Sequence, residues 1–255
     1  MQKIVILALL GWLAATTGSY AAKLLGVSAD TGNVYQIDTA NAGSPVLKFS
    51  LGAGKDFAGL AFSPVRRTYF AYSRLENKVY EFNKAGAILG IISVDRALTQ
   101  GFGGPRGIAF DAQGRLYVVG FNNDVYILNI STGKTTLKFR ATGPTSELES
   151  LAPLDNLAFL AIGVRSQVLV VTRGTGQMTS IASLPVGDLD SMTGTIGGWI
   201  YMSESGSNSF LHAYNPFTQS YQSLGWRISR ISAVLRSSRL TPNKRVKRRP
   251  HASSL

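Results

Sequence analysis

The 255-residue chain contains no cysteine and only two histidines, and its basic residues outnumber its acids by 26 to 14. The absence of cysteine excludes disulfide scaffolds, thiol catalysis and thiolate zinc sites. Two histidines leave almost no material for histidine-based metal or acid–base chemistry. Hydrophobic residues make up 45% of the chain, which permits a substantial core and excludes disorder throughout.

Only one run in the chain is both long and apolar, and it lies at the amino terminus. Residues 4–15 are apolar except for Gly11, follow Lys3, and precede small and polar residues at 16–22. This order is typical of a secretory signal peptide, which we predict over residues 1–22 with cleavage after Ala21 or Ala22. A buried first strand or an uncleaved anchor is the alternative. Export of a chain without cysteine favours a bacterial periplasm or exterior, so we expect a secreted or periplasmic protein.

The positive charge is concentrated near the carboxyl terminus. Residues 227–255 carry nine Lys and Arg and no acid, whereas residues 1–226 carry 17 against 14 acids. We predict a basic disordered tail over residues 236–255, because its few apolar side chains cannot offset the entropy of ordering it. Such a tail could contact an anionic surface, or it could be an inert extension or a frameshifted end. We expect no specific nucleic-acid partner.

A short strand-like phrase recurs through the chain. It is rich in β-branched and aromatic residues, and most copies end in Asp, Asn or Thr before a turn. The copies are residues 33–38, 78–83, 124–129, 167–172 and 210–215. Their equivalent positions, Val34, Val79, Val125, Val168 and Leu211, are spaced by 45, 46, 43 and 43 residues. The chain is therefore built from internal repeats.

Each copy of the phrase has further predicted strands around it. A second strand precedes each copy, at residues 24–27, 68–72, 115–119, 157–161 and 199–202, and apolar segments such as residues 136–139 follow it. A third strand, richer in small residues that suit a crowded axis, comes earlier still, at residues 59–62, 107–110, 150–153 and 191–194. Four short strands with a period of about 40–48 residues are typical of a β-propeller blade.

The first unit has no innermost strand of its own. Residues 231–234 (Ile-Ser-Ala-Val) follow the innermost strand of the last unit at about the repeat interval, so we predict that they complete the first blade and close the ring. The sequence thus predicts an all-β fold. We expect a β-propeller of five four-stranded blades over residues 23–235, closed by strand 231–234. An incomplete six-bladed ring is the alternative.

Several strand motifs are shared with a known class of proteins. They are Gly-Leu-Ala-Phe at 59–62, Gly-Ile-Ala-Phe at 107–110, Leu-Tyr-Val-Val at 116–119, and the Val-Tyr…Asn-Ile-Ser-Thr-Gly phrase at 125–133. In these motifs the chain resembles secreted bacterial β-propellers of the NHL, YVTN and quinoprotein-like kind. The resemblance implies blades rather than a chemistry, since such proteins include scaffolds, ligand binders and enzymes.

The loops that enter the innermost strands should converge at one end of the propeller axis. The candidate ligand-binding residues of this face are Asp56, Arg106, Asn122, Glu147, Glu149, Asp188, Asp190 and Arg230. No cofactor is required, but the four acids from two adjacent blades could hold Ca²⁺, with Glu149 and Asp190 as ligands. This set resembles the axial calcium of gluconolactonase- and paraoxonase-type hydrolases, where the ion polarises a lactone or ester carbonyl. Otherwise the acids are solvated and pair with arginines such as Arg106 or Arg165.

The sequence supplies no catalytic set. No Gly-x-Ser-x-Gly elbow occurs, and His212 lies within a predicted strand, where we expect a hydrogen-bonded or half-exposed residue without a catalytic role. We therefore expect an exported, non-enzymatic monomer that binds a protein or glycan at the propeller face. The alternative is a calcium-dependent hydrolase of the lactonase or esterase type with an axial metal site.

Overall fold

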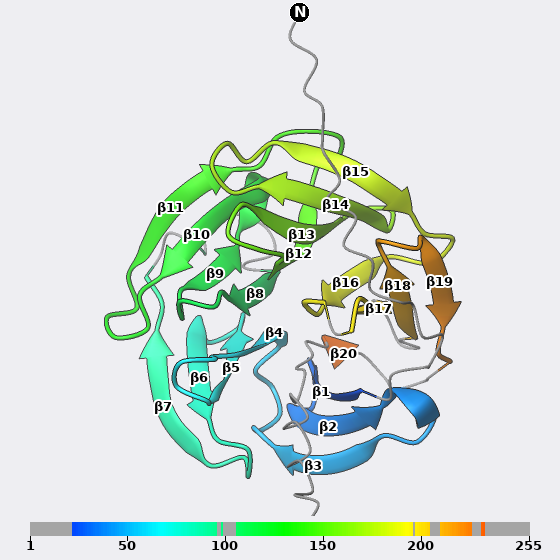
Figure 1. The fold of residues 1–255 in the computed structure, drawn as a ribbon. Helices are drawn as coiled ribbons and strands as arrows, with labels where there is room; N and C mark the ends of the chain where they lie inside the picture. Colours follow the sequence, from blue (N-terminus) through cyan, green and yellow to red (C-terminus); the bar gives the residue numbers. More distant parts are fainter. Residues whose placement is uncertain are drawn as a thin grey trace, which may run out of the picture.

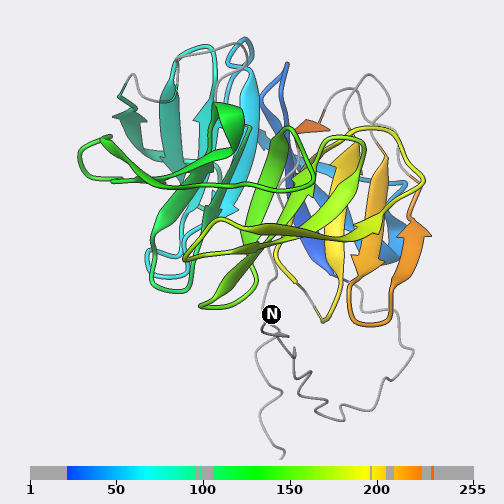
Figure 2. The same cartoon turned by 90° about the horizontal axis from the view of Figure 1, so that it is seen from above.

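The computed structural model describes residues 22–95, 98, 106–195, 197–204, 210–225 and 231–232. In these residues twenty strands pair into five separate four-stranded antiparallel sheets. The sheets stand around a common axis as the blades of a β-propeller (Figure 1, Figure 2). The predicted five-bladed, all-β propeller is confirmed, and the six-bladed alternative is wrong. No helix in the described ranges is long and apolar enough to cross a membrane.

The strands of each blade are named here from the axis outwards. Blade 1 contains β20 (Ile231–Ser232), β1 (Lys23–Ser28), β2 (Asn33–Asp38) and β3 (Val46–Ser50). Blade 2 contains β4 (Phe57–Phe62), β5 (Tyr69–Ser73), β6 (Lys78–Phe82) and β7 (Ile88–Ser93). Blade 3 contains β8 (Gly107–Phe110), β9 (Leu116–Val119), β10 (Asp124–Leu128) and β11 (Thr135–Arg140). Blade 4 contains β12 (Leu148–Pro153), β13 (Ala158–Gly163), β14 (Gln167–Thr172) and β15 (Met178–Ser183), and blade 5 contains β16 (Leu189–Met192), β17 (Ile200–Glu204), β18 (Leu211–Asn215) and β19 (Ser220–Ser223).

Blade 1 is assembled from two segments that are far apart in the sequence. In its antiparallel pairing with β1, β20 places Ser232 opposite Val27 and Ile231 opposite Ser28. The predicted closure of the ring is therefore confirmed for these two residues. Residues 233–234 lie outside the described residues, as do positions 1–21 of the predicted signal peptide and the whole predicted tail at 236–255.

Small residues allow the innermost strands to approach one another closely. A Cβ added to Gly59 would lie 3.1 Å from the backbone nitrogen of Ile108. A Cβ added to Gly107 would lie 3.1 Å from both the Cα and the Oγ of Ser150. Because β4, β8 and β12 are this close, larger side chains at these positions would separate the blades at the axis.

The hydrophobic core is divided into five clusters, each of which lies between two neighbouring blades. Between blades 3 and 4, the rings of Tyr117 and Phe159 meet edge to face with centroids 4.8 Å apart. Between blades 1 and 2, Phe49 and Phe82 meet in the same way at 5.6 Å. Each blade thus buries both of its faces against its neighbours, and burial of apolar surface holds the ring together.

Turns at the outer rim also join neighbouring blades. The carbonyl oxygen of Gly176, in the turn between β14 and β15, accepts a hydrogen bond of 3.0 Å from the backbone nitrogen of Thr142, just after β11. In the equivalent place, Gly133 accepts a bond of 3.0 Å from Asp95, just after β7. Figure 1 shows the end of β7 beside the turn between β10 and β11. Backbone N–H groups of one blade therefore find hydrogen-bond acceptors in the carbonyl oxygens of the next blade.

Candidate functional site

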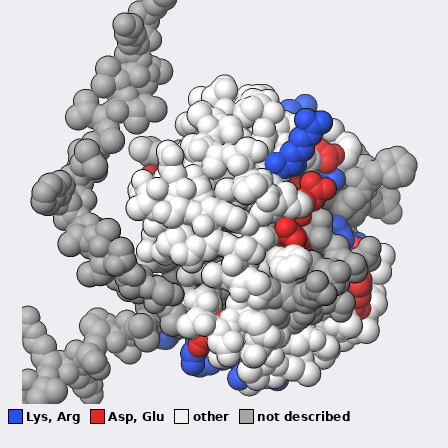
Figure 3. All heavy atoms as spheres, turned by 90° about the vertical axis from the view of Figure 1, so that its right-hand side faces the viewer, with Lys and Arg blue, Asp and Glu red and all other residues white. Residues whose placement is uncertain are grey.

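Six of the eight predicted ligand-binding residues gather at one end of the axis. We call this surface the charged face. It consists of Asp56, Arg74, Arg106, Glu147, Glu149, Asp188 and Asp190, from blades 2 to 5. In Figure 3, basic and acidic side chains alternate along one edge of the molecule, and most of the remaining described surface in that view is uncharged. The expected convergence of loops at the axis is thus seen in the structure.

Arg106 is the centre of the charged face. Its Nη1 lies 2.5 Å from both carboxylate oxygens of Glu149, and its Nη2 lies 3.1 Å from Oε2 of Glu147. Only 25% of the Arg106 side chain and 12% of the Glu149 side chain are exposed. Burial by itself would lower the pKa of Arg106, but the hydrogen bond and charge of Glu149, with the charges of Glu147 and Asp190, raise it overall. Arg106 therefore remains a cation that ties two acids together.

Asp190 has a strongly perturbed carboxyl group. Burial raises its pKa to about 6, and the neighbouring charges of Glu149 and Asp188 add to the increase. Arg74 and Arg106 act in the opposite direction. At this end of the axis the acids are thus crowded enough to oppose one another's ionisation.

Bulges in the innermost strands position two of these acids. The register between β12 and β13 shifts between Leu148 and Ser150, and the register between β16 and β17 shifts between Leu189 and Ser191. The extra residues are Glu149 in β12 and Asp190 in β16. A β-bulge redirects the side chain of the extra residue and often lies next to a functional site. Arg106 stands directly before β8, so three successive blades place a charged residue at the same level of the axis.

Arg74 belongs to the charged face but was not predicted. Its Nε and Nη2 donate to the two carboxylate oxygens of Asp56 at 2.8 Å and 2.7 Å. It follows β5, in a loop between the second and third strands of blade 2. The sequence does show an arginine directly after a predicted strand. Its proximity to Asp190, however, depends on how the blades are turned about the axis.

The two remaining predicted residues are not part of this cluster. Asn122 lies in the turn η3 (Phe121–Asn123) with a φ of 57°. Its buried neighbour Asn123 accepts a hydrogen bond of 2.7 Å from the backbone nitrogen of Leu148 and so joins blades 3 and 4. Arg230 lies outside the described residues. Ligand binding by the eight predicted residues stays a prediction.

The contacts of Glu149 do not suit a calcium site in this arrangement. Both of its oxygens are engaged by Arg106, so a calcium ion there would have to displace a guanidinium. Across the part of the chain that the structure describes, no three His, Asp or Glu residues are grouped so that they could hold a metal ion. Calcium binding by Glu149 and Asp190 stays a prediction.

His212 has a structural environment, as the sequence indicated. It is buried in β18, where Nδ1 lies 2.8 Å from the hydroxyl of Tyr221 and Nε2 lies 3.2 Å from Oε1 of Glu204. Burial lowers its pKa, although Glu204 acts to raise it. Of the two expected environments, hydrogen-bonded or half-exposed, the structure shows the hydrogen-bonded one.

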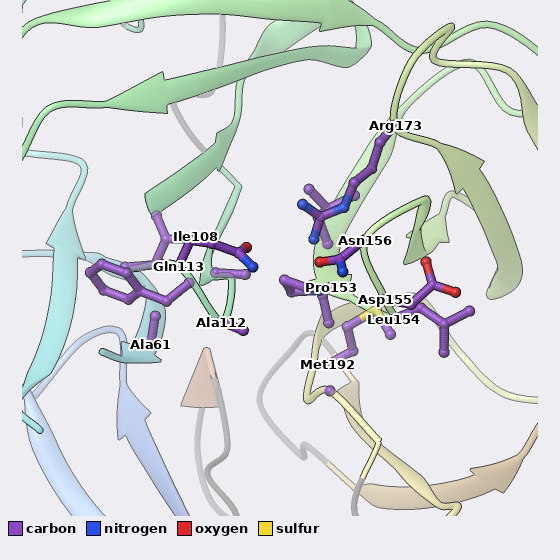
Figure 4. Close-up of a pocket in the computed structure, with 15 residues that line it drawn as sticks. Ala61, Ile108, Ala112, Gln113, Pro153, Leu154, Asp155, Asn156, Arg173 and Met192 are labelled. Atoms are coloured by element: carbon purple, nitrogen blue, oxygen red, sulfur yellow. The ribbon is translucent and has the colours of Figure 1, made fainter. Parts of the chain in front are cut away.

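A pocket that the sequence did not indicate lies at the opposite end of the axis. It has a volume of about 300 Å³ and forms where β4, β8, β12 and β16 end. Its walls include Ala61, Ile108, Leu151 and Met192, with the polar side chains of Gln113, Asn156 and Arg173 (Figure 4). Periodicity alone does not show that loops from four blades enclose a cavity there.

Comparisons with known proteins support the fold. No family model matches the chain, and no curated protein matches it. A chain in the crystal structure of a nidogen/laminin complex is similar with a TM-score of 0.53 and 14% identity, over 84% of this chain and 85% of that chain. A structural genomics protein of unknown function from Bacteroides thetaiotaomicron VPI-5482 is similar with a TM-score of 0.57 and 14% identity, over 83% of this chain and 60% of that chain. At these identities the likeness shows the fold alone. The protein is a five-bladed β-propeller.

Proposed function

We propose that the protein is an exported, non-enzymatic β-propeller that binds a protein or glycan partner at the charged face. The observation that carries this proposal is the set of paired charges that four blades place around one end of the axis. The resemblance of its strand motifs to secreted propellers of the NHL, YVTN and quinoprotein-like kind is consistent with it. The predicted signal peptide over residues 1–22 supports export.

The charged face has the properties of a polar recognition surface. Its arginines are fixed by carboxylates, so their donors are oriented before a partner arrives. The exposed fractions of the Arg74, Asp56 and Glu147 side chains are 35%, 30% and 35%, so these side chains can contact a partner. Charges of both signs in a fixed pattern favour a partner with the complementary pattern and speed its association.

The test compares neutralised variants of the charged face with a matched variant elsewhere. Wild-type protein, an Arg74→Gln/Glu147→Gln double variant and a Lys134→Gln variant are photo-crosslinked to a bacterial cell-envelope extract. Lys134 is an exposed lysine in the turn between β10 and β11, away from the charged face. We expect one partner to be captured by the wild type and by Lys134→Gln, and to be lost with the double variant and at high salt. Equal capture by all three proteins would refute the proposal.

The competing function is a calcium-dependent lactonase or esterase, and one observation favours it. Burial raises the pKa of Asp190, the charges of Glu149 and Asp188 add to the increase, and a divalent cation would relieve the repulsion among these acids. Thermal melting with calcium and with a chelator separates the two functions, since calcium at 100 times its Kd would stabilise the fold by about 2.7 kcal/mol. We expect no calcium-dependent shift and no turnover of lactones or aryl esters. A shift that Asp190→Asn abolishes, together with turnover, would replace the binding proposal by the hydrolase.

A further inference from the structure

The pocket at the end of the axis opposite the charged face has an apolar wall and a single arginine that points into it. Its volume of about 300 Å³ would hold roughly ten water molecules at about 30 Å³ each. Ala61, Ile108, Leu151 and Met192 from four blades form much of the wall. Figure 4 shows the guanidinium of Arg173 directed into this space, with Asn156 beside it. The cavity therefore combines a small apolar volume with the cation of Arg173, and its lining also includes Asp155.

Arg173 is held in place before any ligand binds. Its Cζ lies 4.2 Å from the centroid of the Phe159 ring and 5.4 Å from that of Tyr117. Its backbone nitrogen donates to the carbonyl of Leu157 at 2.8 Å. Only 11% of its side chain is exposed. A guanidinium fixed by aromatic rings loses little conformational freedom when it binds an anion.

The Arg173 guanidinium is weakly hydrogen-bonded within the described residues. Its Nε is buried and makes no hydrogen bond, and the bonds that it does make, both from Nη1, are long: 3.4 Å to Asp111 and 3.5 Å to Tyr117. Elsewhere in the protein, Arg74 and Arg140 each donate from both Nε and Nη2 to one carboxylate, Arg74 to Asp56 and Arg140 to Asp124. Arg173 makes no such two-atom contact with a carboxylate of the described residues; its contact with Asp111 is a single long one. A guanidinium whose own contacts are this long can gain shorter, charge-assisted hydrogen bonds from a ligand carboxylate.

The acid nearest to Arg173 is shared with a second arginine. Burial by itself would raise the pKa of Asp111, but hydrogen bonds from the backbone and guanidinium of Arg115, and one from Arg173, hold it below its ordinary value. Arg115 makes the shorter contact, with its Nε 2.7 Å from Asp111, so this one carboxylate is shared by two arginines. The carboxylate of Asp155 is bonded to the backbone of its own loop, at 2.6 Å from the nitrogen of Leu157 and 2.7 Å from that of Ala158. Arg173 therefore has only a long, shared contact with a carboxylate, at 3.4 Å.

We propose that this pocket binds a small carboxylic acid, whose carboxylate lies on the guanidinium of Arg173 and whose apolar part lies against Ile108, Leu151 and Met192. The volume admits a ligand of roughly ten non-hydrogen atoms, such as a short fatty acid or an aryl acetic acid. The carboxyl terminus of a peptide presents the same group and is the second source of this chemistry. The site is separate from the charged face, so its test does not depend on the function proposed above.

Isothermal titration calorimetry of the whole secreted chain tests the proposal. The probes are hexanoate and phenylacetate, their neutral amides, and the tripeptide Ala-Ala-Leu with a free or an amidated carboxyl terminus. We expect an acid to bind and its amide to bind at least about tenfold more weakly, because hydrogen bonds to charged groups contribute about 1.5–3 kcal/mol. Preference for the free acids identifies a small-molecule site, and preference for the tripeptide identifies a peptide terminus. If no carboxylate binds better than its amide, the proposal is wrong.

Variants inside and outside the pocket test whether the acid binds there. Arg173→Gln should weaken the binding of the acid by about tenfold to a hundredfold, whereas Arg140→Gln, on an outer strand, should leave it unchanged. Because Arg173→Gln could also disturb packing on Phe159, a second variant fills the space from the rim: Ala112→Trp, at an exposed lining residue, should abolish binding without lowering the melting temperature. Binding that both pocket variants retain at wild-type affinity would overturn the proposal.

Discussion

Replacing Gly176 by alanine should loosen the contact between blades 3 and 4 from the outside of the ring. Gly176 has a φ of 73°, and a Cβ on it would lie 2.4 Å from the carbonyl oxygen of Arg140. The left-handed backbone alone costs an alanine about 1–2 kcal/mol. The overlap adds strain of the size seen in overpacked cores, about 1–3 kcal/mol. We expect Gly176→Ala to lower the free energy of unfolding by about 2–5 kcal/mol, which is a fall in Tm of at least about 4 °C for a domain of this size.

A matched control lies two residues away in the same turn. Gly174 does not have a positive φ, and a Cβ on it would have nothing within 4 Å. Both substitutions restrict the unfolded chain equally, so the difference between them measures the folded state alone. Urea unfolding followed by tryptophan fluorescence gives both free energies. If Gly174→Ala and Gly176→Ala were equally stable, the turn would not rest on the neighbouring blade as described.

Three further predictions follow from the ring and its ends. Deleting residues 231–255 should lower the melting temperature far more than deleting residues 237–255, because only the first deletion removes β20 and uncovers the edge of β1. Equal melting temperatures of the two shortened proteins would contradict closure by β20. Burial raises the pKa of Asp190 to about 6, above the ordinary value of about 4. Between these two values the folded state keeps a proton that the unfolded state has released. The free energy of unfolding therefore falls as the pH rises through about 6. Asp190→Asn should therefore gain stability relative to wild type between pH 4 and pH 7 in urea titrations, and a constant difference across this range would show that Asp190 titrates normally. The tail at residues 236–255 should make the chain co-sediment with anionic vesicles at low salt but not at high salt, and equal sedimentation of a tail-trimmed chain would remove this role.

The sequence predicted the blades well because four strands in equivalent positions, β2, β6, β10 and β18, end in or are followed by an Asp or Asn that caps the next turn. Asn129 accepts hydrogen bonds from the backbone nitrogens of Ser131 and Thr132 at 2.9 Å and 3.2 Å, and Asn215 does the same for the turn that follows β18. Such side chain-to-backbone turns are local, so they are visible in the sequence as a repeated Asn or Asp. The prediction of where the innermost strands begin was less accurate. Three of them begin two residues earlier than predicted, because a bulge interrupts their alternation.

The sites were predictable only where one loop position repeats from blade to blade. The equivalence of Arg106, Glu149 and Asp190 follows from the period, and the structure brings these residues together. Arg173 gave no such signal, because its surroundings come from blade 3 and from the aromatic ring of Phe159 on an adjacent strand. A cavity depends on how loops from several blades meet, and neither periodicity nor composition reports that.

The composite first blade has a consequence for the order of folding. Blades 2 to 5 are each formed from one continuous stretch of chain, so their strands pair through short turns and can form early. The contact between Val27 and Ser232 joins segments at nearly opposite ends of the propeller sequence, and bringing such distant segments together carries the largest loop-closure entropy in the molecule. Closure of the ring should therefore be the late, rate-limiting event in refolding. Until it occurs, β1 carries an unpaired edge that can capture a strand of another molecule, so the yield of refolded protein should fall as its concentration rises.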